Sequence, residues 1–261
     1  LHAEGDVIAA EEIDLARRRA EFLLGYFWHE HPRVFQRTGA LDDWGAIGPG
    51  LYTQCAYLLE SVVAARDRPI DAGILARCLW EHVVTFAWLA IDPSVYLPQW
   101  VRHEAKERQA MVSDLRKAGY EVPSEAIDTA RTYSAFARGV EGHFLSAIER
   151  AEAADNFWGR YLPEVFAQGG RYSFRGQYAL LFRGYSAWLH PRIIALQEFG
   201  SEVGPSRVQI GRPQPTGPKA TTGAPHLFCM ALVVGADRLG WPCGAGLKRC
   251  LEAFAPEWQC A

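Results

Sequence analysis

Apolar residues recur with a helical period along most of the chain. Between Ile8 and His31, apolar positions form one stripe and charged positions cover the opposite face. Pro32 and a segment rich in Gly, Asp and Pro that ends at Gly50 separate this stretch from the next one. The pattern predicts helices over residues 8–31, 51–65, 72–91, 94–118, 124–150 with a break near Gly139 and Gly142, 154–167, 174–199, 226–239 and 245–254.

The predicted helix over residues 72–91 is apolar on nearly every face, which indicates a central and buried position. Arg77 and Glu81 lie one turn apart on this helix, so we expect them to form a buried or half-buried ion pair. The next helix is more polar and is followed by Gly119, which we expect to adopt the left-handed conformation of a helix cap.

The domain organisation follows from the same pattern. Residues 1–199 are predicted to form an antiparallel helical bundle. Residues 200–226 are rich in Pro and Gly and contain one β-like run, Arg207–Ile210, so we expect a loop or a short hairpin there. Residues 227–261 are expected to form C-terminal helices that pack on the same domain. The fold class is therefore all-α.

Composition and charge exclude several classes of protein. The chain has 261 residues, of which 49% are hydrophobic and 12% aromatic, so it can bury a large core. No apolar run is long enough to span a membrane, and no signal peptide is recognisable at the start of the sequence. We expect a cytoplasmic protein with no membrane partner. The formal net charge of −3 provides no overall positive field, so binding of nucleic acid would require a local basic surface.

Common catalytic signatures are absent from the sequence. It contains no GxxxxGK[ST], GxGxxG or GxSxG motif, which leaves phosphate-binding loops and a hydrolase nucleophile elbow without support. No Glu is followed by His three positions later, as a di-metal carboxylate bundle would require. We therefore expect neither a metal nor a cofactor.

The remaining candidate chemistry is an Arg and a His on one helix face. In the run YALLFRGYSAWLHP, His190 follows Arg183 by two helical turns, so both side chains can point into one cleft and hold a phosphate between them. We expect both residues to lie near Arg77 and Glu81, because buried charges need partners.

Two segments also resemble a known superfamily. YALLFRGYSAWLHP resembles the Arg-x(4–6)-His helix of the HEPN superfamily, helical proteins that include metal-independent ribonuclease toxins and abortive-infection factors. ARCLWEHVVTFAWLAIDP resembles the Arg-x-x-x-Glu helix of an HEPN-like bacterial branch. The resemblance implies a homodimer that cleaves RNA in phage defence or as a toxin.

The resemblance also implies roles for individual residues. Arg183 would neutralise the scissile phosphate, and His190 would act as acid or base while a ribose 2′-hydroxyl attacks. The residues assigned to the site are Arg183, His190 and Glu81 for catalysis and Arg77, Tyr185 and Ser186 for substrate binding.

Three alternatives stay open at the level of the sequence. Arg183 and His190 could tie helices together around polar partners such as Glu81. The protein could be a non-catalytic module that binds a nucleotide or a protein partner through the same cleft. It could also be a small-molecule enzyme that uses its Trp-rich interior as an apolar pocket.

Overall fold

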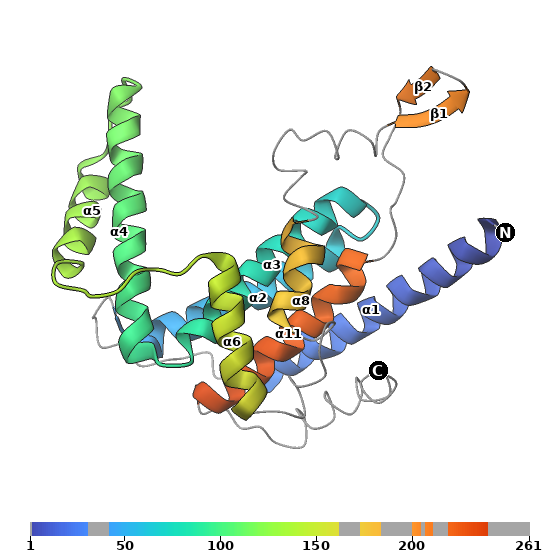
Figure 1. Ribbon diagram of the computed structural model, residues 1–261, viewed down its shortest axis with the longest axis horizontal. Coiled ribbons are helices and arrows are strands. Elements are labelled where there is room, and N and C mark those ends of the chain that lie inside the picture. Colours follow the sequence, from blue (N-terminus) through green and yellow to red (C-terminus); the bar gives the residue numbers. More distant parts are fainter. Residues whose placement is uncertain are drawn as a thin grey trace.

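The computed structural model describes residues 2–30, 42–161, 173–183, 200–204, 207–210 and 219–239. The described helices are α1 (His2–Glu30), α2 (Trp44–Ala64), α3 (Pro69–Leu89), α4 (Pro93–Lys117), α5 (Ser124–Phe136), α6 (Ala147–Tyr161), α8 (Phe174–Gln177), the π-helix η1 (Tyr178–Arg183) and α11 (Lys219–Arg238). Two strands, β1 (Gly200–Gly204) and β2 (Arg207–Ile210), pair in antiparallel fashion. The predicted all-α fold is confirmed, with this hairpin as an appendage (Figure 1).

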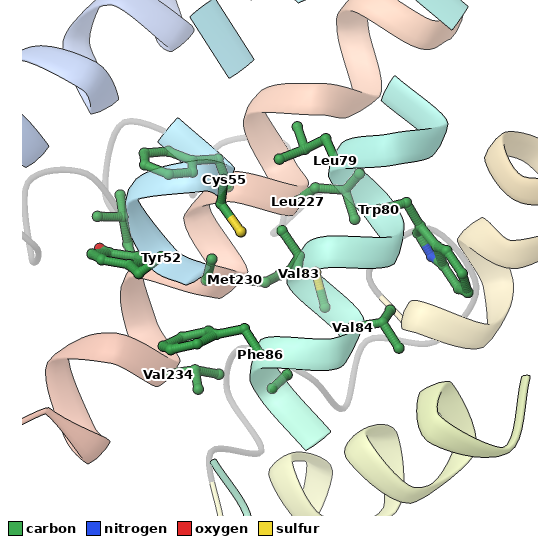
Figure 2. Packing of buried hydrophobic residues seen from close by; sticks show 14 of the residues in the cluster. Tyr52, Cys55, Leu79, Trp80, Val83, Val84, Phe86, Leu227, Met230 and Val234 are labelled. Carbon is green, nitrogen blue, oxygen red and sulfur yellow. The ribbon is translucent and has the colours of Figure 1, made fainter. Parts of the chain in front are cut away.

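Helix α3 is the centre of the molecule. It packs against α2 and α11 on one side and against α6, α8 and η1 on the other. Figure 2 shows Leu79, Val83 and Phe86 pointing toward α2 and α11, while Trp80 lies on the opposite side of α3. The all-round apolar sequence of this helix is explained by neighbours on both sides, as predicted.

Aromatic rings fill the space between α2, α3 and α11. Tyr52 stacks on Phe86 with 5.5 Å between ring centroids and on Phe228 with 5.9 Å, and Phe27 from α1 meets Tyr52 edge-on at 4.9 Å. All three partners are buried, and Tyr52 is fully so. Ring pairs of this kind add to the free energy gained from burying their area.

Helix α2 begins earlier than the predicted start at Leu51. Asp43 caps its N-terminus, because the carboxylate accepts a hydrogen bond from the Gly45 amide at 3.0 Å. Gly48 lies so close to Trp44 and Leu239 that a Cβ there would meet both at 3.0 Å. Gly48 thus permits close packing of α2, and the prediction of a loop was wrong for residues 44–50.

Helix α11 also starts earlier than expected. It begins at Lys219, within the segment that the sequence assigned to a loop or hairpin, and it contains Pro225. Ala224 is fully buried, and a Cβ at Gly223 would lie 4.0 Å from Leu181 of η1. Packing against the core thus outweighs the low helix propensity of Gly and Pro here. The predicted helix over residues 245–254 lies outside the described residues.

Helices α4 and α5 form a hairpin at one end of the molecule (Figure 1). Gly119 has a φ of +81°, its amide donates to the Arg116 carbonyl, and the Tyr120 amide donates to the Leu115 carbonyl. This is a Schellman cap, which confirms the predicted role of Gly119. Gly139 and Gly142 also have positive φ and lie in the predicted break before α6.

None of the described helices combines the length and the apolar character that crossing a membrane requires.

Candidate functional site

The candidate site lies where η1 and α6 pack on α3. Arg77 and Glu81 stand one turn apart on α3, with 3.8 Å between Nη2 and Oε2. The guanidinium of Arg77 covers the ring of Phe182 at 4.5 Å, and Phe182 directly precedes Arg183 at the end of η1. The described part of the second HEPN-like segment, Tyr178–Arg183, therefore lies against the helix that carries the first. Tyr185, Ser186 and His190 lie outside the described residues.

Aromatic packing fixes η1 against α3. The indole of Trp80 donates a hydrogen bond to the carbonyl of Phe174 at 3.0 Å. The rings of Tyr178 and Phe182 stack at 5.1 Å, and each also packs on Trp80. This arrangement positions the chain that leads to Arg183.

The sequence predicted one α-helix over residues 174–199, and its first part differs. Residues 178–183 form a π-helix after a single α-helical turn. The wider π-turn allows Tyr178 and Phe182 to stack face to face, with an interplanar angle of 14°. Such turns are rare in proteins and occur frequently at functional sites. Arg183 ends this turn with an exposed side chain, whose guanidinium lies 5.5 Å from the centre of the Tyr178 ring.

A second anchor for the segment comes from α6. The Asp155 carboxylate accepts hydrogen bonds from the amides of Phe174 and Arg175, at 2.8 and 2.9 Å. Burial raises the pKa of Asp155, although these amide donors act in the opposite direction. The carboxylate thus joins the start of α8 to α6.

Arg150 on α6 completes the charged group, and sequence reasoning did not identify it. Its Nη2 lies 3.7 Å from Oε1 of Glu81, so the Glu81 carboxylate stands between Arg150 and Arg77. The Arg150 side chain is only 4% exposed. We refer to Arg77, Glu81 and Arg150 below as the arginine–glutamate cluster.

The surroundings hold the Arg150 guanidinium in place. It covers the Phe144 ring at 4.2 Å, and Nη1 donates to the Leu145 carbonyl at 2.8 Å. Phe144 in turn stacks on the His103 ring at 4.5 Å. Within the described part of the chain, Nε of Arg150 has no hydrogen-bond partner. Burial lowers the pKa of Arg150 to about 10, against the opposing effect of Glu81, so the side chain is still cationic at neutral pH.

The predicted ion pair of Arg77 and Glu81 forms, but it is looser and more solvated than a buried pair. The Arg77 side chain is 17% exposed and that of Glu81 is 40% exposed. Neither arginine approaches the Glu81 carboxylate within hydrogen-bond distance. Loss of Glu81 should therefore cost less free energy of unfolding than the loss of one partner from a fully buried ion pair, because water screens the carboxylate.

Two surface hollows lie elsewhere on the molecule. One, of about 490 Å³, is lined by Ile91, Tyr96, Ala153, Asn156, Phe157 and Arg160. The other, of about 460 Å³, lies along α5. Neither includes a residue of the arginine–glutamate cluster, so these hollows do not link the cluster to an apolar small-molecule pocket. Among the described residues, no group of three or more His, Cys, Asp or Glu is arranged to hold a metal ion.

No protein-family model, curated protein or solved structure matches the chain.

Proposed function

We propose that this protein is a metal-independent endoribonuclease of the HEPN-like type. The observation that carries the proposal is the contact between Arg77 and Phe182, since it brings the Arg-x-x-x-Glu helix against the segment that ends in Arg183. The exposed side chain of Arg183 is available to a polymeric substrate, and the preceding π-turn is of a kind common at functional sites.

The proposed reaction uses a group of the substrate as the nucleophile. The ribose 2′-oxygen attacks the adjacent phosphorus, the bond to the 5′-oxygen breaks, and a 2′,3′-cyclic phosphate forms. A base removes the 2′-hydroxyl proton and an acid delivers a proton to the leaving 5′-oxygen. The guanidinium of Arg183 stabilises the negative charge that develops on the phosphate oxygens. His190 supplies one of the two proton transfers.

A homodimer would supply the second proton-transfer group. In the proposed assembly, two copies of the segment with Arg183 and His190 face one cleft, so that one imidazole acts as base and the other as acid. We extend the proposal to a cytoplasmic role as a toxin or in phage defence, with cellular RNA as the substrate.

The test is cleavage of a mixed-sequence single-stranded RNA in the presence of EDTA. The expected products carry 2′,3′-cyclic phosphate ends, which mass spectrometry identifies, and a DNA of the same sequence stays intact because it lacks the 2′-hydroxyl. Arg183→Ala and His190→Ala should each abolish cleavage and leave the circular dichroism spectrum unchanged.

Matched controls are available within the chain. Arg175→Ala removes another exposed arginine of the same segment, and His143→Ala removes an exposed histidine between α5 and α6. Both variants should cleave like the wild type. Intact RNA after prolonged incubation, or cleavage that persists in the His190 variant, would refute the proposal in favour of a binding module.

A further inference from the structure

The arginine–glutamate cluster has features of an anion-binding site. Arg77 and Arg150 come from different helices, and their Nη2 atoms lie on either side of one carboxylate, at 3.8 and 3.7 Å from its two oxygens. A phosphate group offers pairs of oxygens to guanidinium groups as a carboxylate does. Inorganic phosphate carries more than one negative charge at neutral pH, and each phosphodiester of RNA carries one. The carboxylate of Glu81 therefore occupies a position between two guanidinium groups that another oxyanion could take.

The positive charge of Arg150 is poorly compensated in the part of the chain that the structure describes. Its side chain is 4% exposed, and Glu81 is the carboxylate within ion-pair distance among the described residues. That carboxylate is itself 40% exposed and stands beyond hydrogen-bond distance. Buried arginines are normally paired and hydrogen-bonded, because removing a guanidinium from water is costly. A further anion would stabilise Arg150.

Within the described part of the chain, the Glu81 carboxylate makes two ion pairs but no contact short enough for a hydrogen bond. The Thr85 hydroxyl donates to the main-chain carbonyl of Glu81 and not to its side chain. Within the described residues, the carboxylate is held only by the two long contacts to arginine. A half-exposed side chain of this kind can rotate into solvent when another anion binds the two arginines.

We propose that Arg77 and Arg150 bind a phosphate group of RNA and that Glu81 is the counter-ion which this phosphate displaces. The identity of the ligand rests on the proposed function, because Phe182 joins Arg77 to the segment that ends in Arg183. The RNA phosphate at the cluster is then a neighbour of the one that Arg183 holds. Binding of phosphate itself does not depend on cleavage.

The experiment measures binding of inorganic phosphate to the full chain by calorimetric titration, with the ionic strength held constant with chloride. Glu81→Gln keeps the size of the side chain and removes the competing charge. Its dissociation constant for phosphate should be about tenfold lower than that of the wild type, which is the effect of removing one partly screened charge a few ångströms from the anion.

Glu152→Gln is the matched control. The Glu152 side chain is 41% exposed and pairs with one exposed arginine, Arg175, at 3.4 Å. This variant changes the net charge of the protein by the same amount and should bind phosphate like the wild type. Equal affinities of wild type and Glu81→Gln, or an equal gain in both variants, would overturn the proposal.

Arg77→Gln tests the other side of the site. Arg77 is more exposed than Arg150, so replacing it should disturb the core less than replacing Arg150 would. The far-ultraviolet circular dichroism spectrum shows whether the variant is folded. Phosphate binding should be lost in Arg77→Gln and in the double variant with Glu81→Gln. Binding that survives both changes would contradict the assignment of the site.

A short single-stranded RNA without a terminal phosphate identifies the source of the phosphate. We expect Glu81→Gln to bind this RNA more tightly than Glu152→Gln does. If inorganic phosphate binds and the RNA does not, the assignment to RNA is wrong and the site takes free phosphate. If both bind but RNA remains uncut, the cluster stands while the proposed ribonuclease activity fails.

Discussion

Trp158 should contribute more to stability than Trp88, although both side chains are fully buried. The Trp158 indole donates a hydrogen bond to the carbonyl of Ala87 at 3.0 Å. Ala87 lies in the last turn of α3. In a longer α-helix the Ile91 amide would donate to the Ala87 carbonyl, but here it donates to the Trp88 carbonyl. Trp158 thus satisfies a carbonyl that the end of α3 leaves open.

Trp88 provides the comparison, because its Nε1 is buried and has no hydrogen-bond partner in the described part of the chain. Its ring packs on Tyr96 and Phe144 with centroids at 4.7 and 5.5 Å. Replacing either tryptophan with phenylalanine removes a similar volume, which costs about 1–2 kcal/mol by analogy with the loss of one or two buried methylene groups. Only Trp158→Phe also leaves a buried carbonyl unsatisfied, at a further cost of about 1–3 kcal/mol.

The assay is equilibrium unfolding in urea, followed by circular dichroism because the substitutions alter fluorescence. Trp158→Phe should lower the free energy of unfolding by about 2–5 kcal/mol and Trp88→Phe by about 1–2 kcal/mol. Equal denaturant slopes for all three proteins would permit this comparison. A loss in Trp88→Phe as large as that in Trp158→Phe would refute the role given to the hydrogen bond.

The remaining predictions concern Glu81 and the thiols. Glu81→Gln should lower the free energy of unfolding by about 1–2 kcal/mol in phosphate-free buffer. The 3.7 Å contact to Arg150 corresponds to about 4 kcal/mol at an effective dielectric constant near 20. Solvent screening of the 40% exposed carboxylate reduces this value. A urea midpoint equal to that of wild type would contradict it. Burial raises the pKa of the Cys55 thiol far above its usual range, so iodoacetamide at pH 8 should alkylate half-buried Cys78 before Cys55, as peptide mass spectrometry can determine. Equal rates at the two sites in the native protein would show that Cys55 is accessible.

The periodicity of the sequence was sufficient to predict α1, α3 and α4 and the central position of α3, whereas α6 runs through the gap that we expected between residues 150 and 154. This prediction succeeded because an α-helix that is apolar on every face needs neighbours on every face. Gly119 could be assigned for a similar local reason, since few other residues adopt a φ of +81° without strain. Both inferences use sequence features that lie within one short stretch of the chain.

The predictions that were wrong concern features that depend on tertiary contacts. The glycines before Leu51 were interpreted as a loop, whereas Gly48 allows α2 to approach Leu239 at the end of α11. The π-turn of η1 occurs where Tyr178 and Phe182 stack on each other and pack on Trp80 of α3. Neither packing partner is near in sequence, so propensity and spacing could not predict these features.

In the candidate site too, the sequence predicted a contact within one helix but not a contact between helices. Arg77 and Glu81 were found because they lie one turn apart on one helix, but Arg150 pairs with Glu81 from another helix. The spacing of residues in α6 could have identified Arg150. Arg150 precedes Ala154 by one helical turn and Trp158 by two, and both of these residues are fully buried. The arginine therefore lies on the apolar face of α6. A charged residue on such a stripe indicates a buried cation that requires an anion.

Stability and binding together distinguish a structural role of the cluster from a ligand-binding role. If Glu81 only ties α3 to α6, the stability lost in Glu81→Gln should be the same with and without phosphate. If the cluster binds phosphate, a ligand present at ten times its dissociation constant stabilises the native state by about 1.4 kcal/mol. That amount is comparable with the loss expected for Glu81→Gln. Phosphate should therefore restore most of the stability of this variant, whereas the Arg77→Gln variant should gain nothing from it.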